Sequence, residues 1–276
     1  MALCAWASIS GRRRCARATI ADRPAAAGTR AGAAATEEAD TPHVTDPAAF
    51  IRAHTTPASA ALVPELMLRL ASEITPLWQA TEDWLAARNI APPFWAFAWP
   101  GGQALARHVL DHPALVAGRR VLDFAAGGGI AGLACARAGA ASVEASEIDP
   151  LARAAVALNA AENGLAVTVA ADVVGAACRW DVILCGDVCY EAPMTGRILP
   201  WLRAMAREAA VVVADPGRAY LPTAGLTAFA RYTVPTTREL EDRETREVTL
   251  YRLALPDAVA DAAGAGSVAA DGPRGR

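Results

Sequence analysis

The sequence predicts an α/β fold: a doubly wound, mostly parallel sheet of seven strands, preceded by N-terminal helices. Two observations support this prediction. Short apolar segments alternate with helical segments of about ten to fifteen residues, as in successive βαβ units. In addition, residues 180–188 (WDVILCGDV) are almost continuously apolar, which is typical of a strand covered on both faces. The 276 residues suffice for one full-sized core.

The predicted elements follow in a regular order. Apolar residues at helical intervals in 61–89 predict one or two helices, and a break at Pro100 and Gly101 precedes a helix from residue 102. Two strands joined by a charged turn close the core over residues 231–255. The predicted strands between these parts are 120–125, 142–148, 167–172, 180–188 and 209–215, and the predicted helices are 130–140, 150–164 and 196–208.

Both ends of the chain differ in composition from the part between them. Residues 1–45 are rich in Ala, Arg, Thr and Gly with little apolar periodicity, and residues 256–276 are similar. We expect both segments to be disordered, which leaves 46–255 as the folded domain. The Arg-rich, acid-poor start resembles a transit peptide, and a start codon assigned too far upstream explains it equally well.

Composition and charge argue against several classes of partner. A net charge of −3 provides no electrostatic footprint for nucleic acid. No apolar run approaches the ~18 residues of a membrane span. His108 and His112 are spaced i, i+4, but no third ligand stands near them, so we predict no metal site.

The loop VLDFAAGGGIAG, residues 121–132, fits two cofactor signatures. Gly127, Gly129 and Gly132 have the G-x-G-x-x-G spacing of a dinucleotide-binding turn. Read from Asp123, the same loop is acid–x–small–x–Gly–x–Gly, the pattern of S-adenosylmethionine (SAM) enzymes. A carboxylate repels a pyrophosphate but attracts the ammonium and sulfonium groups of SAM, so Asp123 favours SAM.

The carboxyl ends of the strands supply further candidate cofactor contacts. Small residues in the glycine loop allow the backbone to approach the ligand, and they are Ala125, Ala126, Gly127, Gly128 and Gly129. Glu147, at the end of the second strand, can accept both ribose hydroxyls of an adenosine, in NAD and SAM alike. Asp149 precedes Pro150 and is interpreted as a helix N-cap. Asp172 ends the third strand, where it accepts from the adenine amino group or caps a helix.

Two aromatic residues lie near the same edge. Trp99 precedes a Pro–Gly–Gly turn and either covers the ligand or packs in the core. Tyr190 lies between Asp187 and Glu191 after the fourth strand, at the mouth of the sheet. A nicotinamide enzyme would need a hydride-transfer partner such as a Tyr-x-x-x-Lys pair or a histidine. The chain has no lysine and no histidine after His112, so the residues favour SAM.

Several segments together resemble the electron-transfer-flavoprotein β-subunit lysine methyltransferases, which are class I (seven-β-strand), Rossmann-like SAM enzymes. The resemblance covers about residues 55–254, and its most specific parts are WPGGQALA and DPGR. The segments that carry it are PPFWAFAWPGGQALARHVLDHP, VLDFAAGGG, ASEIDPLARAAVALNAAENG, WDVILCGDVCYE and ADPGR.

The resemblance implies a SAM-dependent protein-lysine N-methyltransferase that acts on the β subunit of electron-transfer flavoprotein. It implies SAM contacts at Trp99, Asp123, Gly127, Glu147 and Asp187. It places the substrate lysine near three catalytic candidates, Asp187, Tyr190 and Glu191. Glu147 stands where the family more often has Asp, and Cys189 stands where an aromatic residue is common.

Alternatives stay open for the acceptor and for two polar segments. The acceptor could be a small amine such as nicotinamide, or another protein such as a ribosomal protein. Arg218 either holds the backbone near Asp215 or faces the substrate, and the charged run 238–247 is interpreted as a solvated turn rather than a contact surface. We expect a monomer in the cytoplasm of a bacterium, or in the mitochondrial matrix if the Arg-rich start is a transit peptide.

Overall fold

The computed structural model describes residues 44–72, 77, 80 and 82–254. Nearly all of the two end segments predicted to be disordered therefore lie outside the described residues. The N-terminal part begins with α2 (Pro47–His54), which Asp46 caps by accepting from the Ala49 N–H at 2.9 Å. In the described part of the chain, no helix is long and apolar enough to cross a membrane.

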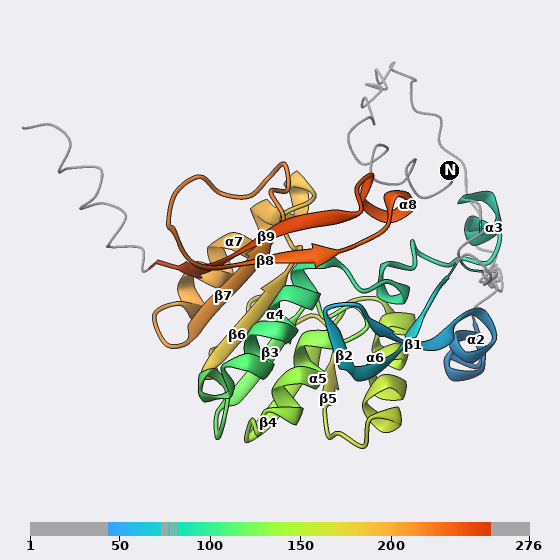
Figure 1. Ribbon diagram of the computed structural model, residues 1–276, viewed down its shortest axis with the longest axis horizontal. Coiled ribbons are helices and arrows are strands. Elements are labelled where there is room, and N and C mark those ends of the chain that lie inside the picture. Colours follow the sequence, from blue (N-terminus) through green and yellow to red (C-terminus); the bar gives the residue numbers. More distant parts are fainter. Residues whose placement is uncertain (1–43, 73–76, 78–79, 81, 255–276) are drawn as a thin grey trace, which may run out of the picture.

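A seven-stranded sheet forms the centre of the molecule, in the order β5-β4-β3-β6-β7-β9-β8 (Figure 1). β3 to β7 run parallel, and β9 pairs antiparallel with both β7 and β8. This confirms the predicted doubly wound, mostly parallel α/β sheet. The strands are β3 (Arg120–Phe124), β4 (Ser142–Ser146), β5 (Thr168–Ala170), β6 (Val182–Gly186), β7 (Ala210–Asp215), β8 (Leu226–Pro235) and β9 (Thr245–Leu253).

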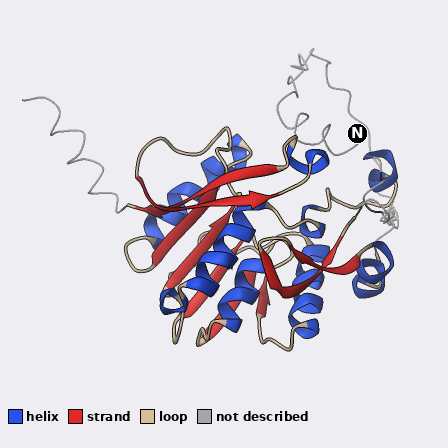
Figure 2. Ribbon diagram, in the orientation of Figure 1, coloured by secondary structure: helices blue, strands red, loops and turns tan. Residues whose placement is uncertain are grey.

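Helices cover both faces of the sheet, as Figure 2 shows. α4 (Pro100–Asp111) and α5 (Ile130–Arg137) pack on one face, and α7 (Ala192–Met205) packs on the other. In β6, Val182 and Leu184 point to the first face, whereas Ile183 and Cys185 point to the second. Because each face is buried under helices, β6 has no polar side.

The prediction of one or two helices in 61–89 is wrong for its first part. Residues Val63–Leu70 form strand β2, which pairs antiparallel with β1 (Thr56–Ala60), and only α3 (Glu82–Ala86) is helical within the described part of the segment. The apolar positions 63, 66 and 70 fit a helical period, whereas 66, 68 and 70 fit a period of two. Tertiary contacts therefore decided between the two structures.

Those contacts come from two asparagines at the end of α6 (Pro150–Glu162). The side-chain amide of Asn163 accepts from the Met67 N–H at 3.0 Å and donates to the Met67 carbonyl at 2.6 Å. Asn159 accepts from the Arg69 N–H at 2.8 Å. The two amides thus satisfy the free edge of β2 as a neighbouring strand would, and stabilise an extended chain there.

Candidate active site

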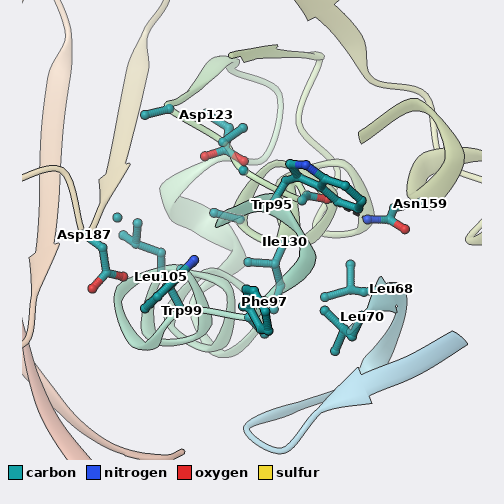
Figure 3. A pocket seen from close by; sticks show the side chains of 18 residues that line it. Leu68, Leu70, Trp95, Phe97, Trp99, Leu105, Asp123, Ile130, Asn159 and Asp187 are labelled. Atoms are coloured by element: carbon teal, nitrogen blue, oxygen red, sulfur yellow. Dashed lines mark hydrogen bonds between the residues drawn. The ribbon is translucent and has the colours of Figure 1, made fainter. Parts of the chain in front are cut away.

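A pocket opens at the carboxyl ends of β3 and β6, where the strand order reverses and where ligands bind in folds of this class. Figure 3 shows that Asp187 lies across the pocket from Leu68 and Leu70 of the N-terminal hairpin. Five of the predicted site residues line this pocket: Trp99, Asp123, Ala125, Gly127 and Asp187. Gly129, Glu147, Asp172, Tyr190 and Glu191 do not line it.

Asp123 is buried at the end of β3, with 3% of its surface exposed. Its Oδ2 accepts a hydrogen bond from the Gly132 N–H at 2.7 Å. A Cβ atom at Gly132 would stand 3.0 Å from that oxygen, so the third glycine of the apparent dinucleotide signature makes room for the carboxylate. Burial, followed by the charge of Glu147, raises the pKa of Asp123 to about 7, against the hydrogen bond from Gly132.

The glycine loop turns tightly between Asp123 and α5. Ala125 and Gly127 have positive φ values of 53° and 55°, and Gly129 is the N-cap residue of α5. A Cβ atom at Gly128 would come within 2.8 Å of the Trp95 carbonyl oxygen, so only glycine permits this approach. The loop therefore presents backbone rather than side chains to the pocket.

Glu147 lies just beyond β4 and holds the glycine loop from outside the pocket. Its Oε2 accepts from the Gly127 N–H at 3.0 Å, and its Oε1 accepts from the Ile148 N–H at 2.7 Å. Its role toward a ribose stays a prediction. Asp149 accepts from the Leu151 N–H at 2.8 Å, which confirms that it caps α6.

Asp172 lies outside the pocket and is exposed. Its carboxylate accepts from the Val174 N–H at 3.0 Å and pairs with Arg197 of α7, and this pairing lowers the pKa of Asp172. The helix N-cap interpretation is wrong, since the described residues 171–181 contain no helix. The predicted adenine contact stays a prediction.

Aromatic residues form much of the pocket wall. The Trp99 Nε1–H donates to the Phe94 carbonyl at 2.7 Å, and the Trp99 ring packs edge-on against Phe94 and Phe97. Trp99 is half-buried, so it packs against its neighbours and also faces the pocket. Sequence reasoning missed Trp95 and Phe97, although the dense aromatic run in FWAFAW was a visible signal.

Asp187 stands where β6 ends, in a backbone conformation with φ of 56°. Its Oδ2 accepts from the Gly101 N–H at 2.6 Å, and its Oδ1 accepts from Arg218 Nη2 at 2.8 Å. Burial raises the pKa of Asp187 to about 6 although the Arg218 guanidinium opposes the rise. A positive φ is unfavourable for aspartate, and these two contacts hold the residue in that conformation.

Of the two alternatives for Arg218, the structure supports the contact with Asp215, whereas a contact with the substrate stays a prediction. Its backbone N–H donates to Asp215 Oδ1 at 2.6 Å, while its guanidinium reaches Asp187 and Glu241. Glu241 ends the short helix α8 (Arg238–Glu241), and its side chain is only 2% exposed. The interpretation of 238–247 as a solvated turn is therefore wrong for Glu241, whereas Glu244 is exposed as expected.

Tyr190 and Glu191 lie at the rim. The Tyr190 ring is 5.9 Å from the ring of Phe94, which in turn contacts Trp99 in the pocket wall. Burial, followed by the charges of Glu191 and Glu147, raises the pKa of Tyr190 to about 12. Glu191 is half-buried and precedes α7, and its carbonyl accepts from the Thr195 N–H at 2.9 Å. Their catalytic roles stay predictions.

The lining of the pocket fits SAM. Two buried carboxylates, Asp123 and Asp187, suit a ligand with ammonium and sulfonium charges, and the aromatic wall suits an adenine ring. The buried Nε1–H of Trp95 has no hydrogen-bond partner among the described residues, and Trp95 lines the pocket beside the glycine loop. Buried donors rarely stay unpaired, so this atom also favours a bound polar ligand. The described residues contain no cluster of His, Cys, Asp or Glu that could hold a metal ion.

Comparisons with known proteins find a family model and a solved structure that are similar to parts of this chain. Residues 105–188 match the model of the ribosomal protein L11 methyltransferase (PrmA) family. Magnesium protoporphyrin IX methyltransferase from Synechocystis, solved with bound SAM, superposes with a TM-score of 0.42 at 19% identity, over 55% of this chain and 79% of that one.

Closer relatives are found among characterised sequences. The electron transfer flavoprotein beta subunit lysine methyltransferase of Xenopus laevis is 39% identical over 181 residues, which are 63% of this chain and 72% of that protein. The Danio rerio protein of the same name is 35% identical over 210 residues, 73% of this chain and 72% of that protein. The chain therefore belongs to the electron transfer flavoprotein beta subunit lysine methyltransferase family.

Proposed function

We propose that this protein methylates lysine side chains of the β subunit of electron transfer flavoprotein, with SAM as the methyl donor. The relatives from Xenopus laevis and Danio rerio carry the name of this substrate. The observation that carries the proposal is the buried carboxylate of Asp187, which lines the pocket together with the aromatic residues Phe97 and Trp99. That position suits a lysine chain that brings a cationic end group into the pocket.

SAM supplies an electrophilic methyl group on its sulfonium sulfur. Asp123 contributes a charge that depends on the ligand: with a pKa of about 7, its carboxyl is partly neutral in the free protein at neutral pH. A cationic ligand favours the ionised carboxylate, so cofactor binding is coupled to loss of the Asp123 proton. The Trp95 indole N–H is available to an acceptor on the ligand.

Asp187 attracts and orients the lysine amine rather than removing its proton. Both of its oxygens already accept hydrogen bonds, and a pKa of about 6 makes it a weak base toward an ammonium group. Tyr190, with a pKa of about 12, keeps its proton at neutral pH. We propose that the amine loses its proton to water as it passes Tyr190 and Phe94 at the rim of the pocket. We also propose that alignment of the amine with the methyl group and the sulfur of SAM lowers the barrier by roughly 7 kcal/mol or more.

The acceptor is tested with the purified protein, methyl-labelled SAM and three candidates: electron transfer flavoprotein, ribosomal protein L11 and nicotinamide. L11 is included because the PrmA model matches residues 105–188, and nicotinamide represents small amines. We expect label on lysine residues of the flavoprotein β subunit, identified by mass spectrometry. Label confined to L11 or to nicotinamide would refute the proposed acceptor.

Two variants separate the role of the site from a general effect of charge. Asp187→Asn should lower the rate about a hundredfold or more, since it removes the charge that faces the amine. Asp181→Asn is the matched control, because Asp181 forms an exposed pair with Arg120 just before β6. It should keep the rate within about twofold.

We also propose that the enzyme acts as a monomer, in the bacterial cytoplasm or in the mitochondrial matrix if its Arg-rich start is a transit peptide. Neither nucleic acid nor a membrane is part of this proposal. Size-exclusion chromatography with light scattering tests the monomeric state, and cell fractionation tests the location.

A further inference from the structure

A chain of charged groups runs from the pocket to the turn between β8 and β9. Arg218 donates from Nη2 to Asp187 Oδ1 at 2.8 Å and from Nη2 and Nη1 to the two oxygens of Glu241 at 2.5 and 3.2 Å. Glu241 Oε2 also accepts from Arg246 Nε at 2.8 Å. The side chains of Asp187, Arg218 and Glu241 are 11%, 16% and 2% exposed, so water screens these contacts little.

Arg218 also contacts a second pocket residue. Its guanidinium carbon lies 5.8 Å from the centre of the Trp99 ring. Neither Arg218 nor Glu241 lines the pocket itself. The orientation of the Arg218 guanidinium thus bears on both Asp187 and Trp99 from outside the ligand site.

Glu241 determines that orientation. An arginine side chain has several rotatable bonds, and a bidentate carboxylate fixes the plane of its guanidinium. Without Glu241, two N–H groups of Arg218 would lose their buried acceptor, and the side chain would turn toward water to regain one. Asp187 would then keep only its contact with the Gly101 N–H.

We infer that Glu241 is a positioning residue of the active site, which acts through Arg218 to hold the carboxylate of Asp187 and the ring of Trp99 in place for methyl transfer. This inference rests on the proposed function only in its kinetic part. No side chain of the turn needs to contact SAM or the acceptor for this role.

The test uses three variants of the full chain. Glu241→Gln leaves one acceptor oxygen for three N–H donors. Arg246→Met removes the other partner of Glu241 and so controls for loss of stability in the hairpin, but it leaves the Glu241–Arg218 pair intact. Glu244→Gln controls for charge on the same turn, since Glu244 forms an exposed pair with Arg238.

Each variant is measured by thermal unfolding, by calorimetric titration with S-adenosylhomocysteine and by steady-state kinetics with SAM varied at a fixed concentration of the acceptor. Rates are expressed per binding site for S-adenosylhomocysteine, so that unfolded protein does not count. We expect Glu241→Gln to lower kcat at least tenfold while KM for SAM changes less than threefold. Glu241→Gln and Arg246→Met should lower the melting temperature by similar amounts, but Arg246→Met should keep kcat within threefold. Glu244→Gln should change neither the melting temperature nor kcat.

Crystal structures of Glu241→Gln and Arg246→Met with S-adenosylhomocysteine give a second readout that needs no acceptor. We expect the Arg218–Asp187 contact to be lost in the first variant and kept near 2.8 Å in the second. An intact contact in Glu241→Gln, or equal losses of kcat in the two variants, would overturn the inference. If the wild-type protein does not methylate the flavoprotein, the proposed acceptor is wrong, and the crystal structures still decide the inference.

Discussion

Replacing Asp123 with asparagine should weaken cofactor binding and, at alkaline pH, stabilise the fold. The buried carboxyl has a pKa of about 7 in the folded protein against its usual 3.8, chiefly because burial disfavours its charge. Asparagine has the same shape and keeps an oxygen that can accept from the Gly132 N–H. The substitution therefore removes the charge while leaving the main contact of the side chain in place.

The pH dependence of this effect has a definite sign. Between pH 4 and 7 the folded protein holds a proton on Asp123 that the unfolded chain has lost, so the contribution of Asp123 to wild-type stability falls as pH rises through this range. At ~1.4 kcal/mol per pKa unit, burial of the ionised group costs roughly 4 kcal/mol above pH 7. The substitution also introduces an amide N–H donor at a buried position, and a buried donor without an acceptor costs about 1–3 kcal/mol at every pH. We expect Asp123→Asn to be less stable than wild type near pH 4.5 and more stable by about 1–3 kcal/mol at pH 8.

Urea unfolding of the ligand-free proteins at pH 4.5, 6 and 8 measures this change of sign. Asp83→Asn, at an exposed position on α3, is the matched control and should follow the wild type at every pH. Calorimetry at pH 8 should show weaker binding of SAM to Asp123→Asn, by about tenfold for a loss of ~1.4 kcal/mol. A stability difference between Asp123→Asn and the wild type that does not change with pH would refute this account of Asp123. A wild type that is more stable than Asp123→Asn at pH 8 would refute it as well.

Three further predictions follow from the same geometry. Because the pKa of Asp187 is about 6, kcat/KM should fall as pH drops through 6 and its carboxylate takes a proton; a profile that is flat from about pH 5 to 8 contradicts this. Gly132→Ala should lower the free energy of unfolding by about 1–3 kcal/mol, because the new Cβ atom would crowd Asp123. Gly196→Ala on α7 is the control: its Cβ atom meets open space, so it should raise the free energy of unfolding by about 0.5–1 kcal/mol. Equal effects of the two substitutions in urea unfolding would contradict the packing argument. Asn159→Leu should cost about 2–4 kcal/mol and weaken binding of S-adenosylhomocysteine, because it leaves the Arg69 N–H and the Gly128 carbonyl without their buried partner; calorimetry that shows unchanged affinity would speak against this link between β2 and the glycine loop.

The parallel part of the sheet could be predicted because each of its elements has a local signal. The apolar segments 120–125 and 180–188 have strand length and contain β3 and β6, and Pro150 after Asp149 marks the start of α6 by a cap that the structure confirms. Ligands bind at strand ends in such sheets, so Asp123 and Asp187 could be chosen without knowing any distance. Both line the pocket.

Residues whose role depends on a distant partner could not be found in the same way. β2 has an apolar pattern compatible with a helix, and it is extended because Asn159 and Asn163, about ninety positions away in the chain, satisfy its edge. Glu241 lies in a run of charges that a solvated turn would also have, and only the fold buries it against Arg218.

The sequence by itself determined the class of the sheet, the order of its parallel strands along the chain and the chemistry of the glycine loop. These depend on local periodicity and on the types of residue at strand ends, which are written within a few positions of each other. The tertiary structure decided that Gly132 serves Asp123 rather than a phosphate, and that a glutamate from the last hairpin supports Asp187. Such contacts join residues far apart in the chain, and burial gives them their strength, so no local pattern could reveal them.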